Sequence, residues 1–193
     1  MLRQFTIALV LSICCSIPST WADYQAGVEA YSRDDVATAY REFLASAKQG
    51  DAPSQFRVGL LCESGQAMIP QDSRQAVAWY LKAAEQGHAG AQFKLGLKHA
   101  TGLDLPQDYR QALAWFLKAA DQGHAGAQFS LGRQYALGQG TPKDLAQAHK
   151  WYSLAGATGN TEATKLRDAL AQQLPSEQLA EAQRLAREWK PKQ

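Results

Sequence analysis

The chain has 193 residues, with 20 lysine and arginine residues against 18 aspartate and glutamate residues. Alanine contributes 34 residues and glutamine 21, whereas valine and isoleucine together contribute 9, four of them within the first 17 positions. Strands favour β-branched residues, and alanine and glutamine cost little in a helix, so we expect an all-α protein. A net charge of +2 with interspersed signs gives no electrostatic basis for binding nucleic acid, and this excludes nucleic acid as a partner.

Residues 1–22 have the pattern of a secretory signal peptide. Arg3 precedes an uncharged apolar run over residues 5–17, which is shorter than the about 20 residues that span a bilayer. We therefore expect cleavage after Ala22, no stable membrane span in the mature chain, and export across the inner membrane to the periplasm. Lipidation is disfavoured because the bulky Ile13 precedes Cys14, where a small residue is preferred.

Cleavage would leave Cys62 as the single cysteine of the mature chain. An exported protein with one cysteine has no internal disulfide framework, so its core must be held by packing. We expect Cys62 to be a small buried apolar residue rather than a reactive thiol.

A repeat of 36 residues organises the rest of the chain. Three tryptophans, three aspartates and three glycines recur at this spacing: Trp79, Trp115 and Trp151; Asp72, Asp108 and Asp144; Gly87, Gly123 and Gly159. The repeats occupy residues 52–88, 89–124 and 125–160, preceded by a degenerate first copy at 23–51 and followed by C-terminal capping helices at 161–193. In the degenerate copy, Glu42 stands at the tryptophan position, as expected for a terminal unit with a solvated face.

Each repeat contains two helical patterns, here called helix A and helix B. In the third copy, helix A covers residues 89–100, Asp108 is positioned to cap helix B, and Gly123 is positioned to end it in the left-handed conformation. Helix B carries an apolar stripe at helical spacing, made of Ala112, Trp115, Phe116, Ala119 and Ala120. We expect the tryptophans to fill the space beside small residues of the neighbouring helix. Stacked pairs of this kind form a solenoid.

The pattern resembles the Sel1-like repeat, a relative of the tetratricopeptide repeat. It is carried in the fourth copy by Ala127, Leu131, Gly132, Gly138, Asp144, Ala148, Trp151 and Tyr152. The 36-residue period exceeds the 34 residues of a tetratricopeptide unit and favours the Sel1-like branch. The resemblance implies an all-α fold, an α/α superhelical solenoid. It also implies that the protein binds other proteins, as members of the family do.

No residue pattern indicates catalysis, a metal or a cofactor. His88 and His124 occupy the same repeat position and are too far apart to share an ion, and His99 and His149 have no ligand-spaced partners, so we expect structural or surface roles. Nucleophile-elbow, phosphate-loop and zinc-protease motifs are absent from the sequence. We therefore expect no catalytic residue, no metal site and no cofactor.

The variable positions of the A helices form the candidate partner-binding site. They carry Arg57, Lys94, Lys98, Arg133 and Gln134. In a solenoid the A helices line the concave face, and Lys94 and Lys98 are one turn apart, which predicts a mildly basic groove for an acidic or extended protein partner. The alternative is an ordinary solvated face.

These observations favour a non-catalytic adaptor that binds an unidentified protein partner through its concave helix A surface. Assembly of an envelope complex and an immunity or inhibitor role in the periplasm both fit this reading. The competing hypothesis is a binder or hydrolase of peptidoglycan or related cell-wall fragments. It predicts converging carboxylates or an aromatic side chain outside the repeat register.

Overall fold

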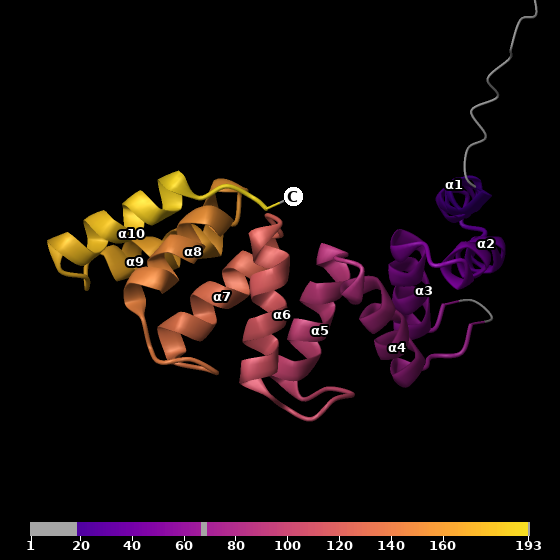
Figure 1. Ribbon diagram of the computed structural model, residues 1–193, viewed down its shortest axis with the longest axis horizontal. Helices are drawn as coiled ribbons and strands as arrows, with labels where there is room; N and C mark the ends of the chain where they lie inside the picture. The colour runs from indigo at the N-terminus through magenta and orange to yellow at the C-terminus, as the bar shows by residue number, and fades with distance from the viewer. Residues whose placement is uncertain (1–18, 67–68, 193) are drawn as a thin grey trace, which may run out of the picture.

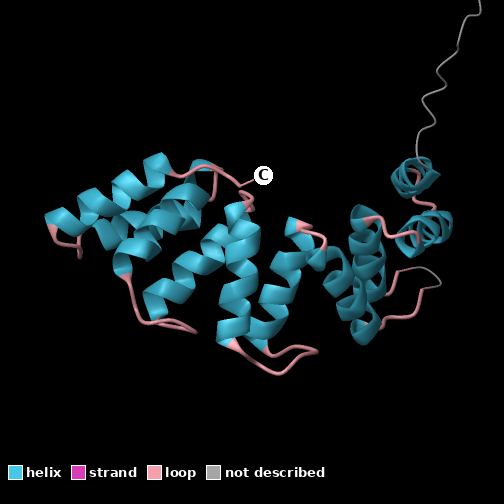
Figure 2. Cartoon of the chain, in the orientation of Figure 1, coloured by secondary structure: helices cyan, strands magenta, loops and turns pink. Residues whose placement is uncertain are grey.

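The computed structural model describes residues 19–66 and 69–192, and these residues form α-helices without any strand (Figure 2). The all-α class predicted from composition is confirmed. The helices are α1 (Ser19–Ser32), α2 (Val36–Lys48), α3 (Ala52–Ser64), α4 (Ser73–Glu85), α5 (Ala89–Thr101), α6 (Tyr109–Asp121), α7 (Ala125–Leu137), α8 (Leu145–Ala157), α9 (Thr161–Ala171) and α10 (Ser176–Glu188). Residues 1–18, which make up most of the predicted signal peptide, lie outside the described residues.

The helices follow one another in a row of pairs from α1 to α10 (Figure 1). Packing is most extensive within the pairs α1–α2, α3–α4, α5–α6 and α7–α8, and each B helix also packs against the next A helix. At the C-terminal end, α9 and α10 both pack against α8. Contacts between neighbours in the sequence dominate, and this confirms the predicted solenoid.

The B helices begin at the aspartates that the repeat predicts as N-caps. Asp72, Asp108 and Asp144 each accept a hydrogen bond from a backbone N–H in the first turn of the helix that follows. Gly123, just after α6, has φ of 88°, so it has the predicted left-handed conformation. These contacts satisfy backbone donors that a helix end leaves unpaired.

The side chain that fills the space inside each pair is the aromatic residue after the tryptophan, so the expectation for the tryptophans is wrong. Tyr80, Phe116 and Tyr152 are buried against Gly59, Gly96 and Gly132 of the preceding A helices. The degenerate first pair keeps this contact, because Phe43 is buried against Gly27 although Glu42 replaces the tryptophan.

Trp79 and Trp115 are only partly buried, whereas Trp151 is buried. The Nζ atom of Lys82 lies 4.3 Å from the Trp79 ring centroid, and that of Lys118 lies 4.2 Å from the Trp115 centroid. Lys150 makes the same cation–π contact with Trp151 at 4.4 Å, so each tryptophan of the three repeats is covered by a lysine.

His88 and His124 have the structural role that the sequence predicts. Each caps the A helix that follows it. The Nδ1 atom of His88 accepts the backbone N–H of Ala91, and that of His124 accepts the backbone N–H of Ala127, at 3.2 Å in both cases. Each ring also packs at a tilt against a phenylalanine of the preceding A helix, Phe56 or Phe93, with centroids 4.5 Å apart.

A chain of glutamines links successive pairs through the core. Gln55, Gln92 and Gln128 are buried, and each donates a hydrogen bond from Nε2 to a backbone carbonyl of the preceding B helix. The Oε1 atoms of Gln55 and Gln92 accept from Gln86 and Gln122, at 2.8 Å in both cases. The bonds to the backbone carbonyls are buried and repeat with the period of the sequence.

Cys62 is 1% exposed and has no disulfide partner, which confirms the buried role expected of it. Within residues 19–66 and 69–192, every helix is too short or too polar to cross a membrane.

Candidate partner-binding surface

The predicted site residues lie on helices α3, α5 and α7. We call the side chains that these helices do not use against their pair partners the helix A surface. Arg57 of α3 and Arg133 of α7 are exposed, whereas Lys98 of α5 and Gln134 of α7 are 6% and 3% exposed. Lys94 of α5 lies between these extremes. The five residues therefore differ in how much of each side chain is accessible to a protein partner.

Glu63 of α3 brings the two lysines together. Lys94 Nζ lies 2.8 Å from Glu63 Oε2, and Lys98 Nζ lies 2.8 Å from Glu63 Oε1. Lys98 also pairs with Asp104 at 2.7 Å, and the Tyr80 hydroxyl donates to Glu63 Oε2 at 2.7 Å. We call these five residues the Glu63 cluster. It joins the A helices of two successive repeats.

The electrostatics of the Glu63 cluster favour its charged form. Burial raises the pKa of Glu63, but hydrogen bonds from Lys94, Lys98 and Tyr80 outweigh this and lower the pKa to about 2. Burial lowers the pKa of Lys98, and its bonds to Asp104 and Glu63 outweigh that effect and raise the pKa above its usual value. Two lysines thus face two carboxylates, and the surface around them is electrically balanced rather than basic. The part that Lys94 and Lys98 play in partner binding stays a prediction.

The contact of Glu63 could not be predicted from the sequence, because this residue lies 31 positions before Lys94. Only the fold of the solenoid brings the two side chains into contact. The neighbouring repeats have Ala100 and Ala136 at the position of Glu63, so the repeat pattern also hides it.

Two pockets open on the helix A surface, on either side of α5. The first, of about 310 Å³, is lined by residues that include Tyr31, Leu60, Leu61, Glu63, Gln66 and Lys94. The second, of about 180 Å³, lies between α5, α6 and α7. Three of the five predicted residues line one of these pockets, namely Lys94, Arg133 and Gln134.

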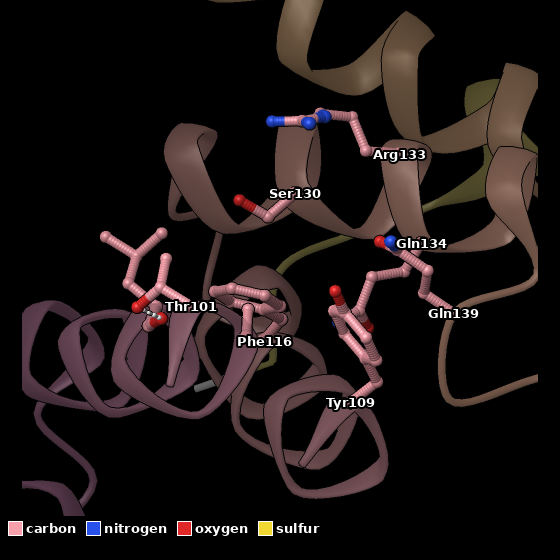
Figure 3. Close-up of a pocket in the computed structure, with 9 residues that line it drawn as sticks. Thr101, Tyr109, Phe116, Ser130, Arg133, Gln134 and Gln139 are labelled. Atoms are coloured by element: carbon pink, nitrogen blue, oxygen red, sulfur yellow. Dashed lines mark hydrogen bonds between the residues drawn. The ribbon is translucent and has the colours of Figure 1, made fainter. Parts of the chain in front are cut away.

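We call the second hollow the Gln134 pocket. Tyr109 and Phe116 come from α6, Thr101 ends α5, and Ser130, Arg133 and Gln134 come from α7 (Figure 3). In Figure 3, Gln134 and Gln139 lie on the side opposite Thr101, with Tyr109 below and Arg133 above. Both side-chain polar atoms of Gln134 are buried without a hydrogen-bond partner among the described residues. The sequence identifies Gln134 only as a variable position of the repeat. Its lack of hydrogen-bond partners depends on the packing of the surrounding helices.

The described residues do not assemble an activated nucleophile around His149. This histidine is 2% exposed, and its Nδ1 lies 3.5 Å from the Ser153 hydroxyl. However, Ser153 donates its proton to the backbone carbonyl of His149 at 2.8 Å, so the imidazole does not take it. Among residues 19–66 and 69–192, histidine, cysteine and acidic side chains do not form a group of three or more that could hold a metal ion.

Two solved structures that resemble this chain are a Sel1 repeat protein and a protein with an SLR fold. A Sel1 repeat protein from Oxalobacter formigenes is 30% identical with a TM-score of 0.72, and the match covers 87% of this chain and 70% of that one. A protective antigen of uropathogenic Escherichia coli strains, which displays an SLR fold, is 26% identical over 88% of this chain with a TM-score of 0.56. This chain spans 45% of the length of that antigen.

An immunity protein from Pseudomonas aeruginosa is 15% identical with a TM-score of 0.43, a similarity too low to support a shared function. The search of curated proteins gave no match. The family model of the Sel1 repeat matches residues 52–88, 89–124 and 125–160, which together make up more than half of the chain. The chain therefore belongs to the Sel1 repeat family.

Proposed function

We propose that this chain is a non-catalytic adaptor that binds a protein partner through its helix A surface. Sel1 repeats generally mediate protein interactions. The observation that carries the proposal for this chain is the pair of pockets on either side of α5, which includes a buried amide with unused hydrogen-bonding capacity. Exposed Arg57 and Arg133 lie on the same set of helices and supply polar contacts for the rim of an interface.

We place the adaptor in the periplasm, on the strength of the signal-peptide pattern in residues 1–22. Envelope-complex assembly and neutralisation of a toxic protein are the two forms of the role that suit this compartment. Fractionation of cells followed by intact-mass measurement tests the placement. We expect a periplasmic protein whose mass corresponds to a chain that begins at Asp23, and a cytoplasmic protein of full mass would contradict it.

Affinity capture tests the adaptor role. The full chain with a C-terminal tag is expressed in its host and cross-linked, and partners are recovered from envelope extract. We compare the unaltered chain with the double variant Arg57→Glu/Arg133→Glu on the helix A surface. The matched control is Arg74→Glu/Arg110→Glu, because Arg74 and Arg110 are exposed on the B helices α4 and α6.

We expect the helix A variant to lose a partner that the B helix control retains. Lys98 is left unchanged because it is buried and ion-paired, so that reversing its charge would unfold the repeat rather than test binding. Capture of identical partners by all three proteins would contradict the proposed surface. Conversion of purified muropeptides by the protein would favour the cell-wall enzyme instead.

A further inference from the structure

Gln134 stands out among the buried polar residues. It is 3% exposed, it lines the Gln134 pocket, and neither its Nε2 nor its Oε1 has a hydrogen-bond partner in the part of the chain that the structure describes. Leaving a buried donor and acceptor unpaired costs stability. The pocket volume of about 180 Å³ is far above the about 10–15 Å³ that one water needs, so a group larger than a single water can enter.

Comparison with the preceding repeat shows how the pocket arises. Lys98 holds the position equivalent to Gln134, 36 residues earlier, and it is paired with Glu63 and Asp104. One repeat later, the positions of these two acids are taken by Ala100 and Gly140. The fourth copy therefore lacks both acidic partners but still has a polar side chain, that of Gln134. The space that the acids would occupy is lined by an unpaired amide.

The chemistry of the amide selects the group that fits. A glutamine side chain presents an NH₂ donor and a carbonyl acceptor side by side. A carboxylate would pair with the NH₂ but would place its second oxygen against Oε1. A secondary amide has its N–H and C=O on opposite sides and can reach only one of the two atoms. A primary carboxamide satisfies both atoms at once, and it does so in either orientation of the Gln134 amide.

We propose that the Gln134 pocket binds the primary carboxamide of a glutamine or asparagine side chain on the protein partner. This inference rests on the proposed adaptor function and names the group that the surface recognises. Leu97, Ala100 and Phe116 provide apolar walls for the methylene groups of that side chain. Tyr109 also lines the pocket, and its hydroxyl accepts from Gln107 Nε2 at 3.0 Å, which leaves its own proton available to donate.

Small probes test the pocket without knowledge of the partner. Propionamide is titrated into the ¹⁵N-labelled full chain, and the side-chain NH₂ signals of Gln134 are followed by NMR. Propionate and N-methylacetamide are the matched probes that lack the primary amide. We expect saturable shifts at Gln134 with propionamide, with a dissociation constant on the order of 10 mM for so small a ligand. The other two probes should bind about tenfold more weakly.

The chain itself supplies the control variant. Leu61 occupies the equivalent position in α3 and is buried, so Gln134→Leu is compatible with the repeat. We expect this variant to remain helical, to lose the propionamide response at Tyr109 and Ser130, and to unfold at a higher temperature. Gln134→Glu is the second variant, because it keeps the shape but lacks the NH₂ group, and it should bind propionamide at least fivefold more weakly.

The outcomes separate the two proposals. Equal binding of propionate and propionamide, or an unchanged response in Gln134→Leu, would overturn the carboxamide assignment. A response to none of the probes, with only ordered waters in a high-resolution crystal structure soaked in propionamide, would overturn it as well. None of these results contradicts the adaptor role if Arg57→Glu/Arg133→Glu still loses its partner in affinity capture. If the substitutions do not change affinity capture while propionamide binds as expected, the proposed adaptor surface is rejected and the carboxamide site is supported.

Discussion

Gly96 of α5 lies directly against the ring of Phe116 of α6: a Cβ atom added to this glycine would lie 2.5 Å from Phe116 Cδ1. The same contact recurs between Gly59 and Tyr80. We therefore expect Gly96→Ala to destabilise the protein by about 1–3 kcal/mol, because overpacking outweighs the about 1 kcal/mol that alanine gains over glycine in a helix. Urea unfolding followed by circular dichroism measures this change.

A double variant shows whether the ring is the cause. Phe116→Ala is expected to destabilise on its own, but Gly96→Ala should add little further cost in its presence because the clashing ring atoms are removed. Strictly additive effects of the two substitutions would mean that the contact does not set the spacing of the helices.

Thr158 interrupts the glutamine chain. It occupies the position of Gln86 and Gln122 with a similar backbone conformation, and the Oε1 atom of the adjacent Gln128 is buried without a partner among the described residues. We expect Thr158→Gln to supply this partner and to stabilise the protein by about 0.5–1.5 kcal/mol. The converse substitution Gln122→Thr is the matched control and should destabilise by a similar amount. A thermal shift of the same sign in both variants would argue against the chain of hydrogen bonds.

The histidine caps predict a dependence of stability on pH. Burial lowers the pKa of His88 and of His124, and each Nδ1 must be unprotonated to accept its backbone N–H. Below pH of about 6.5 the unfolded chain therefore binds more protons than the folded chain, so stability is full above that pH and falls as the pH drops toward the folded pKa. Thermal unfolding between pH 8 and pH 5 is the measurement.

Asn160 shows which variant isolates this effect. It holds the equivalent position before α9, and its Oδ1 accepts the backbone N–H of Ala163 at 2.9 Å. The double variant His88→Asn/His124→Asn should keep both caps while losing most of the change in melting temperature between pH 7 and pH 5. A residual slope is expected from His149, whose pKa burial also lowers. An unaltered slope would show that the caps do not titrate as described.

Glu63 is expected to stabilise the protein by linking α3 to α5 through Lys94 and Lys98. Glu63→Gln removes the charge that Lys94 and Lys98 share and should destabilise the protein by about 2 kcal/mol at pH 7. Because the pKa of Glu63 is about 2 in the folded chain and higher when unfolded, this contribution is present above pH of about 4.5 and is lost as the pH falls toward 2. The variant and the unaltered chain should therefore converge in stability in acid.

An exposed ion pair provides the comparison for Glu63. Glu181 pairs with Arg184 on α10, where both side chains are about half exposed. We expect Glu181→Gln to change stability far less than Glu63→Gln does, because solvent screens such pairs. Comparable losses in Glu63→Gln and Glu181→Gln would show that the Glu63 cluster is an ordinary surface pair.

The repeat period predicted the helices, the aspartate caps and the solenoid, because each depends on residues that are close in sequence. The period could not decide whether Trp115 or Phe116 points inward. Adjacent helix residues both fall within a wide apolar stripe, and only Gly96 on the neighbouring helix makes room for one of them. The partners of Lys94 and Lys98 were hidden for a similar reason, since Glu63 belongs to another repeat and departs from the pattern. What the sequence could not supply is which side chains meet across neighbouring helices.

Hydrogen exchange of the free chain and of the complex with its captured partner tests the helix A surface most directly. Amides in α3, α5 and α7 should become more protected on binding, together with the residues around the Gln134 pocket, while the exposed faces of α4 and α6 change little. Protection confined to α4, α6 and α8 would contradict the account, because it would place the partner on the B helices.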